Sequence, residues 1–286
     1  MAALFRVPRA LGLVLLLLVQ ARSSTATAED ATPSNLARFV EQARGYEIRR
    51  QERGAEPAVL VHPPVLQWNN PARTGEDGAT FVWTNRGRPV VIGSMFRYRT
   101  KDTIHSKHEF HSLATGPLLC RIGGETVWKP SLPGISFAPL PEAPSPALGS
   151  KQRTLQMRTL ARDFGGVLLD EKRERSELRL VPKPIFEYEP TDGEVLQGAI
   201  FSLAFGTDPE ILIILEAARS AGKDPAWRYA LARYHYFDVT ATHRGKTVFH
   251  RDPDFTQAGH QIGDPAHMDK AYVSFKPRID PEKVTE

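Results

Sequence analysis

The chain of 286 residues has one cysteine, no strong excess of either charge, and no long apolar run outside its N-terminal end. The single cysteine, Cys120, excludes a disulfide framework and a zinc site made of several cysteines of one chain. It follows two leucines and is expected to be a small buried hydrophobe. Apolar residues make up 41% and charged residues 24%, which excludes a wholly disordered chain and a multispan membrane protein.

The one long apolar run predicts a secretory signal peptide over residues 1–28. Arg6 and Arg9 precede the run LGLVLLLLV. Small residues suited to cleavage lie at the end of two short segments, so cleavage is expected either after Ala21 or after Ala28. The run is far shorter than the roughly 20 residues that a membrane-spanning helix needs. We therefore expect a secreted or periplasmic protein with no transmembrane segment in the mature chain.

Removal of the signal peptide leaves almost no net charge. Residues 1–28 hold three arginines and no acid, so their loss lowers the formal net charge from +4 to +1. A near-neutral chain lacks the basic surface by which proteins hold nucleic acid. We therefore expect a protein or a small molecule as the partner, and no nucleic acid.

Comparison of the chain with itself indicates an internal repeat. Glycines, prolines and apolar residues of residues 59–92 recur in the same order in residues 179–212. Ordered self-similarity is typical of repeated units, so we predict a tandem duplication. The predicted segments are a signal peptide (1–28), repeat 1 (29–129), a proline-rich linker (130–153), repeat 2 (154–250) and a partly disordered C-terminal tail (251–286).

Each repeat opens with a helical pattern and continues with short alternating runs. Ser34 is a suitable N-cap for a helix that stops at Gly45, and a similar pattern over residues 155–164 stops at Gly165. The runs that follow are separated by turn residues, as hairpins require. We therefore predict an α+β fold, in which each duplicated unit is one N-terminal helix followed by an antiparallel β-sheet.

No cofactor motif is complete, so no cofactor is assigned. Lys246 lies in a Gly-Lys-Thr run, but Thr240 stands where a phosphate-binding loop needs glycine. Chemistry is suggested by one cluster alone, in which His105, His108, Glu109 and His111 follow one another closely. They are the weak candidates for metal ligands, with Glu109 and His111 the weak candidates for catalysis.

A strand places this cluster on two faces. His105, Glu109 and His111 would share one face with Lys107, and His108 would lie on the other with Phe110. Glu109 and His111 then form an acid–base pair or supply two ligands to a metal that needs a third. A polar strand face with hydrogen-bonded histidines explains the same pattern.

The two predicted repeats differ at this cluster. The positions of repeat 2 that match Glu109 and His111 are Ala230 and Ala232, so any such site is single. Repeat 2 instead has aromatic and basic residues over 228–236, which are typical of recognition surfaces. A half-exposed strand explains that segment equally well.

Four segments of the chain resemble a family of uncharacterised secreted bacterial proteins. They are Trp68-Asn69-Asn70-Pro71, His108-Glu109-Phe110-His111-Ser112, Gln156-Met157-Arg158 and Gly206-Thr207-Asp208-Pro209-Glu210. The resemblance extends over most of the mature chain. It implies an exported bacterial protein, and it implies no activity, cofactor or site.

Two functions are compatible with these observations. The first is a non-enzymatic exported binding or scaffold protein, in which two fused units form a cleft at their junction. The alternative is a hydrolase or metal-dependent enzyme that uses His111 and Glu109. No complete catalytic constellation is visible, so the first is favoured and enzymatic activity is left open.

Overall fold

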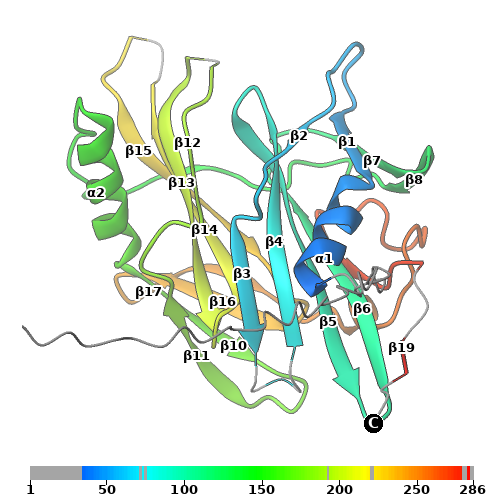
Figure 1. Ribbon diagram of the computed structural model, residues 1–286. Helices are drawn as coiled ribbons and strands as arrows, with labels where there is room; N and C mark the ends of the chain where they lie inside the picture. Colours follow the sequence, from blue (N-terminus) through cyan, green and yellow to red (C-terminus); the bar gives the residue numbers. More distant parts are fainter. Residues whose placement is uncertain are drawn as a thin grey trace, which may run out of the picture. The chain divides into compact units, whose positions relative to one another are not determined.

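Strands dominate the fold. The computed structural model describes residues 34–70, 73, 76–191, 193–219, 222–278 and 282–283, and the predicted signal peptide lies outside them. Of the described residues, 50% lie in strands and 11% in helices (Figure 1). The predicted α+β class is therefore wrong, and the fold is mostly β. The described part has two α-helices, of 10 and 12 residues, whereas its strands form extended antiparallel sheets.

The first half of the described chain has one α-helix and eight strands. They are α1 (Asn35–Arg44), β1 (Tyr46–Arg50), β2 (Val59–Leu60), β3 (Leu66–Asn70), β4 (Glu76–Asn85), β5 (Arg88–Thr100), β6 (Thr103–Ser112), β7 (Leu118–Ile122) and β8 (Glu125–Trp128). β5 and β6 form a long antiparallel pair, and β1, β7 and β8 form a small separate sheet.

The remaining elements follow a short strand in the predicted linker. They are β9 (Ala138–Pro139), α2 (Ser150–Ala161), β10 (Phe164–Leu169), β11 (Arg175–Leu180), β12 (Phe186–Tyr188), β13 (Val195–Phe205), β14 (Asp208–Ala218), β15 (Ala226–Arg233), β16 (Asp238–His243), β17 (Lys246–Arg251), η1 (Phe255–Ala258), β18 (Tyr272–Phe275) and β19 (Glu282–Lys283). Among the helices that the structure describes, none is long and apolar enough to cross a membrane.

The two halves have the same strand order. A seven-stranded sheet has the order β18-β6-β5-β4-β2, with β19 also paired to β6 and β3 to β4. A nine-stranded sheet has the order β17-β16-β10-β11-β13-β14-β15-β9, with β12 also paired to β13. β2, β4, β5 and β6 thus follow one another as β11, β13, β14 and β15 do. The halves differ where β10 pairs with β11, because β1 has only an isolated bridge from Arg49 to Pro57, which lies just before β2. Tandem duplication of an ancestral unit stays a prediction.

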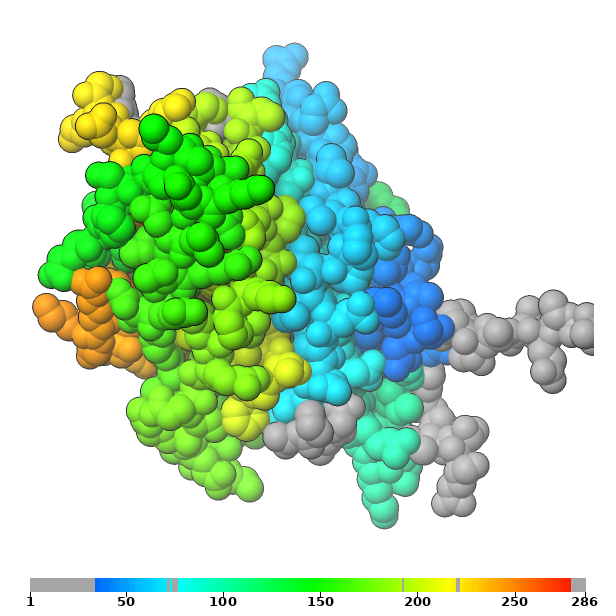
Figure 2. Space-filling view, turned by 60° about the vertical axis from the view of Figure 1, so that its left-hand side comes forward, coloured from blue at the N-terminus to red at the C-terminus, as the bar shows by residue number. Residues whose placement is uncertain are grey.

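Alternating side chains create cores on both faces of each large sheet. In β14, Leu212 and Ile214 pack with Val82 and Ile92 of the seven-stranded sheet. Their neighbour Ile213 faces the other way and packs with Met157 of α2. This period of two means that the two large sheets share one core, while α1 and α2 cover their outer faces (Figure 1). Figure 2 shows the second half, in green and yellow, in direct contact with the cyan first half.

Local sequence signals explain where α1 begins and ends. The Ser34 hydroxyl accepts a hydrogen bond from the Ala37 amide at 3.3 Å, as its predicted N-cap role requires. Gly45 caps the C-terminal end, and Phe39 and Ala43 are buried against the sheet. Burial of a phenylalanine stabilises the folded state by about 1.5–3 kcal/mol, so the packing of Phe39 fixes α1 on the sheet.

The predicted linker and tail both contribute to the sheets. β9 pairs with β15, and Leu140 beside it is buried. In the tail, β18 pairs with β6 along its whole length. The tail therefore lies directly beside the predicted cluster on β6.

Candidate functional site

β6 presents its side chains to two different environments, as the strand pattern predicts. Lys107 and Glu109 lie toward the second half, where the ammonium of Lys107 is 4.4 Å from the centre of the Tyr236 ring. Phe110 points into the core of the first half, where its ring contacts the Trp83 ring at a centroid distance of 5.6 Å. The predicted cluster is therefore divided by the sheet itself.

Two of the four predicted residues lie apart from Glu109. His108 is buried in the first-half core, where Nδ1 is 2.7 Å from the Tyr46 hydroxyl. Burial lowers its pKa to about 3, so it stays neutral at ordinary pH. His105 is partly exposed and stacks on Tyr98 at 5.1 Å. Neither histidine joins a common centre.

Glu109 and His111 share a face but have separate partners. Glu109 accepts a hydrogen bond from the Tyr272 hydroxyl at 3.0 Å. Nδ1 of His111 lies 2.8 Å from the Ser112 carbonyl oxygen, so Nδ1 carries a proton and donates it. Burial, opposed by this hydrogen bond, lowers the pKa of His111 to about 4. Among the described residues, no three His, Cys, Asp or Glu side chains are placed to hold a metal ion.

Glu109 opens instead onto a cavity of about 190 Å³. We call it the aromatic pocket. It is lined by Trp68, Phe96, Tyr98, Lys107, Glu109, Asp208, His235, Tyr236, Ala258 and Ser274. These residues come from both halves and from the tail, so the pocket exists only once the whole chain is folded. Sequence signals pointed to parts of it, since His235 and Tyr236 lie in the predicted recognition segment and Asp208 in a segment of the resemblance.

The aromatic side of the pocket offers hydrocarbon surface. The rings of Trp68 and Phe96 lie with their centroids 5.5 Å apart. Nε1 of Trp68 donates a hydrogen bond to the Thr80 hydroxyl at 3.2 Å, so its polar atom is already satisfied. Trp68 therefore contributes an apolar face to the pocket and no free donor.

On the charged side of the pocket, an arginine contacts two carboxylates. Nη1 of Arg73 lies 3.0 Å from Oδ2 of Asp208 and 2.8 Å from Oε1 of Glu210. Glu210 is fully buried, and its two carboxylate oxygens accept no well-aligned hydrogen bond from the described residues. Burial, and then the nearby charges of Asp208 and Glu109, raise the pKa of Glu210 against the opposing effect of Arg73. Arg73 thus neutralises the charge of the Asp208 carboxylate, whereas the environment of Glu210 favours its protonated, neutral form.

His235 supplies a neutral donor. Its Nδ1 accepts a hydrogen bond from the Phe237 amide at 3.1 Å, so the proton lies on Nε2. Burial first, then the charges of Arg73 and Lys107, lower the pKa of His235 well below its ordinary value. The aromatic pocket therefore combines one cation, two carboxylates and a neutral imidazole with aromatic walls.

Comparison with models of protein families, with curated proteins and with solved structures gave no match. The resemblance to a family of exported bacterial proteins stays a prediction. Function is therefore argued from the pocket and from the side chains that surround it.

Proposed function

We propose that this protein is a non-enzymatic binding protein that holds one small, neutral, polyhydroxylated molecule, such as a monosaccharide, in the aromatic pocket. The observation that carries this proposal is the combination of aromatic rings with Lys107, Glu109 and Asp208 in one cavity. Ligand sites typically join apolar walls with a few well-placed polar groups. Sugars need both, because they have apolar C–H faces and hydroxyls that donate and accept.

The size of the pocket supports a small ligand. Its volume of about 190 Å³ corresponds to about six water molecules in the liquid. A single sugar ring or a short polyol is of this size, whereas an oligosaccharide would extend beyond it.

The charge balance supports a neutral ligand. Lys107 and Glu109 carry opposite charges, and Arg73 forms an ion pair with Asp208. A charged ligand would leave an unpaired charge in a largely buried place, which is costly. A hydroxyl group can donate to the carboxylates and accept from Lys107 or His235, and it adds no charge.

The alternative of a hydrolase that uses Glu109 and His111 has less support. Glu109 lines the pocket, whereas His111 is not among its lining residues. An acid–base pair must reach one substrate together. Export is also part of the proposal and depends on the pattern in residues 1–28.

Calorimetric titration tests the proposal. Neutral monosaccharides and polyols are compared with glucosamine and glucuronate, which have the same ring but carry a charge. We expect a neutral member to bind with one site per chain and more tightly than its charged counterparts. If no neutral sugar or polyol binds, or if a charged counterpart binds more tightly, the proposal is wrong.

Variants locate the binding. Glu109→Gln should weaken binding about tenfold to a hundredfold, because a hydrogen bond to a charged group is worth about 1.5–3 kcal/mol. Glu177→Gln is the matched control, since Glu177 is exposed on β11 and outside the pocket. His111→Asn should bind like the wild type. Loss of binding in His111→Asn but not in Glu109→Gln would refute the assignment to this pocket.

A further inference from the structure

We propose that a second cavity, between the segment after β1 and the β4–β5 turn, binds a polyvalent oxyanion through Arg50 and Arg86. Its volume is about 500 Å³. It is lined by Arg50, Glu52, Arg53, Gly54, Ala55, Glu56, Pro57, Val59, Thr84, Asn85, Arg86 and Arg88, and we call it the arginine pocket. It shares no lining residue with the aromatic pocket, so this inference is independent of the proposed function.

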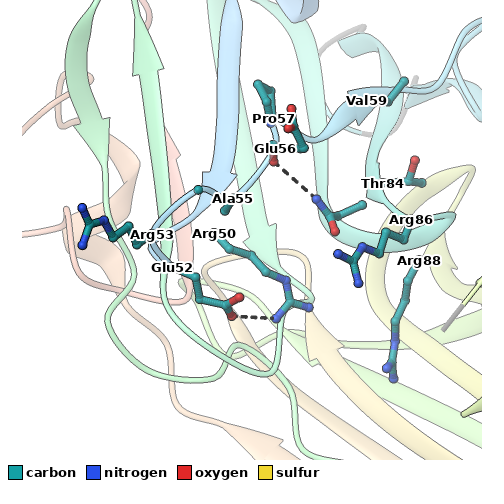
Figure 3. A pocket seen from close by; sticks show the side chains of 12 residues that line it. Arg50, Glu52, Arg53, Ala55, Glu56, Pro57, Val59, Thr84, Arg86 and Arg88 are labelled. Carbon is teal, nitrogen blue, oxygen red and sulfur yellow. Dashed lines mark hydrogen bonds and ion pairs between the residues drawn. The ribbon is translucent and has the colours of Figure 1, made fainter.

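Two guanidinium groups reach into the arginine pocket from opposite sides. Figure 3 shows the side chains of Arg50 and Arg86 extending toward the same space, while Arg53 points away from it. Of the four arginines that line the pocket, Arg50 and Arg86 are therefore the two whose guanidinium groups can meet a ligand there. Arg50 has one weak partner, because its Nη1 is 3.6 Å from a Glu52 carboxylate whose side chain is 73% exposed. Such exposed pairs contribute little and are easily exchanged for another anion.

Arg86 occupies a backbone position that does not suit arginine. With Gly87 it forms the two-residue turn between β4 and β5, and its φ is +50°. Such turns favour Asn, Asp or Gly at this place. The turn is anchored by the Thr191 amide, which donates a hydrogen bond to the Arg86 carbonyl at 3.1 Å. An arginine is thus held at the rim of the pocket despite its backbone cost.

Another two-residue turn with an arginine at positive φ, in the second half, shows what a structural arginine does in such a turn. Arg244 has a φ of +49° in the turn between β16 and β17. Its guanidinium forms ion pairs with Asp163, at 2.9 Å, and with Glu142. The Thr191 hydroxyl also donates a hydrogen bond to the Arg86 carbonyl, at 3.5 Å, but the Arg86 guanidinium forms no ion pair or hydrogen bond with a described residue. Arg86 is exposed at the rim of the pocket, so its guanidinium can reach an anion that enters from solvent.

The wall behind the arginine pocket consists of paired charges. Nη2 of Arg88 lies 2.9 Å from Glu216, which is fully buried. Arg228 binds the same carboxylate with its Nε at 2.8 Å. Nη1 of Arg88 also lies 3.9 Å from the Glu194 carboxylate, so this wall is balanced in charge and Arg50 and Arg86 are the groups left to meet an anion.

The ligand class follows from guanidinium chemistry. Arginine binds phosphate and carboxylate oxygens through paired N–H groups. Two arginines on opposite sides fit an anion with two or more such groups. Pyrophosphate and citrate are suitable probes, because they share the charge pattern and differ in the oxyanion.

Calorimetric titration of the full-length protein at low ionic strength tests this inference. We expect pyrophosphate or citrate to bind with one site per chain and to lose affinity as salt is added. Tighter binding of pyrophosphate would identify phosphate as the recognised group, and tighter binding of citrate would identify carboxylate. Absence of binding by both would overturn the proposal.

Arg86→Asn separates binding from folding. Asparagine suits a positive φ, so this variant should melt at the same temperature as the wild type or higher, yet bind at least about tenfold more weakly. Arg50→Gln should weaken binding similarly. Arg99→Gln is the control, since Arg99 is exposed on β5 and does not line the pocket. Equal affinity of all three variants and the wild type would refute the inference.

Discussion

An alanine at Gly78 tests whether the aromatic pocket depends on the position of Trp68. Gly78 lies opposite Trp68 in the β3–β4 ladder. A Cβ placed on it would lie 2.6 Å from the Trp68 ring and 2.7 Å from Cβ of Phe96. Both distances are too short, so these two pocket residues must move.

The second half offers a matched control. Gly198 lies opposite Tyr188 in the β12–β13 ladder, and an added Cβ would lie 2.3 Å from the Tyr188 ring. Overpacking of a core costs about 1–3 kcal/mol, while replacing glycine stabilises by about 0.4–1 kcal/mol through the unfolded chain. The net loss for each variant is therefore about 1–2 kcal/mol by these opposing terms.

The two variants should differ in binding and not in stability. In urea unfolding, Gly78→Ala and Gly198→Ala should lose similar amounts of the free energy of unfolding. In thermal unfolding, each should lower the melting temperature by about 2–8 °C. Titration with the best neutral sugar should show weaker binding for Gly78→Ala alone. If Gly198→Ala loses affinity to the same extent, or if Gly78→Ala keeps it, the pocket is not the binding site.

Three further predictions concern stability and processing. Glu216→Gln should lower the free energy of unfolding by about 3–5 kcal/mol, because it leaves two guanidinium groups without their buried carboxylate; an unchanged urea midpoint would contradict this. Because the pKa of His111 falls from 6.5 in the unfolded chain to about 4 in the fold, this residue should stabilise the protein above pH 6.5 and lose that contribution as the pH falls to 4. His111→Asn should flatten this part of the pH profile of urea unfolding. N-terminal sequencing of exported protein should begin at Arg22 or Glu29, and a start at Met1 would disprove the signal peptide.

Local features of the chain were determined by the sequence alone. The cap at Ser34, the end of α1 at Gly45 and the two faces of β6 depend on residues within one turn or one strand of each other. Burial of Cys120 was likewise expected from its apolar neighbours. Periodicity and capping depend on residues close together in the chain, so both can be predicted from the sequence.

The fold class and the pocket were decided by the tertiary structure. One helical pattern in each predicted repeat suggested α+β, but most of the described chain pairs into strands, and even the predicted linker and tail add strands to the sheets. Trp68, Glu109 and Asp208 meet in one cavity although they are far apart in the sequence. Their meeting depends on which strands pair and which sheet faces pack together, and these long-range choices follow from burial across the whole chain, which no local pattern encodes.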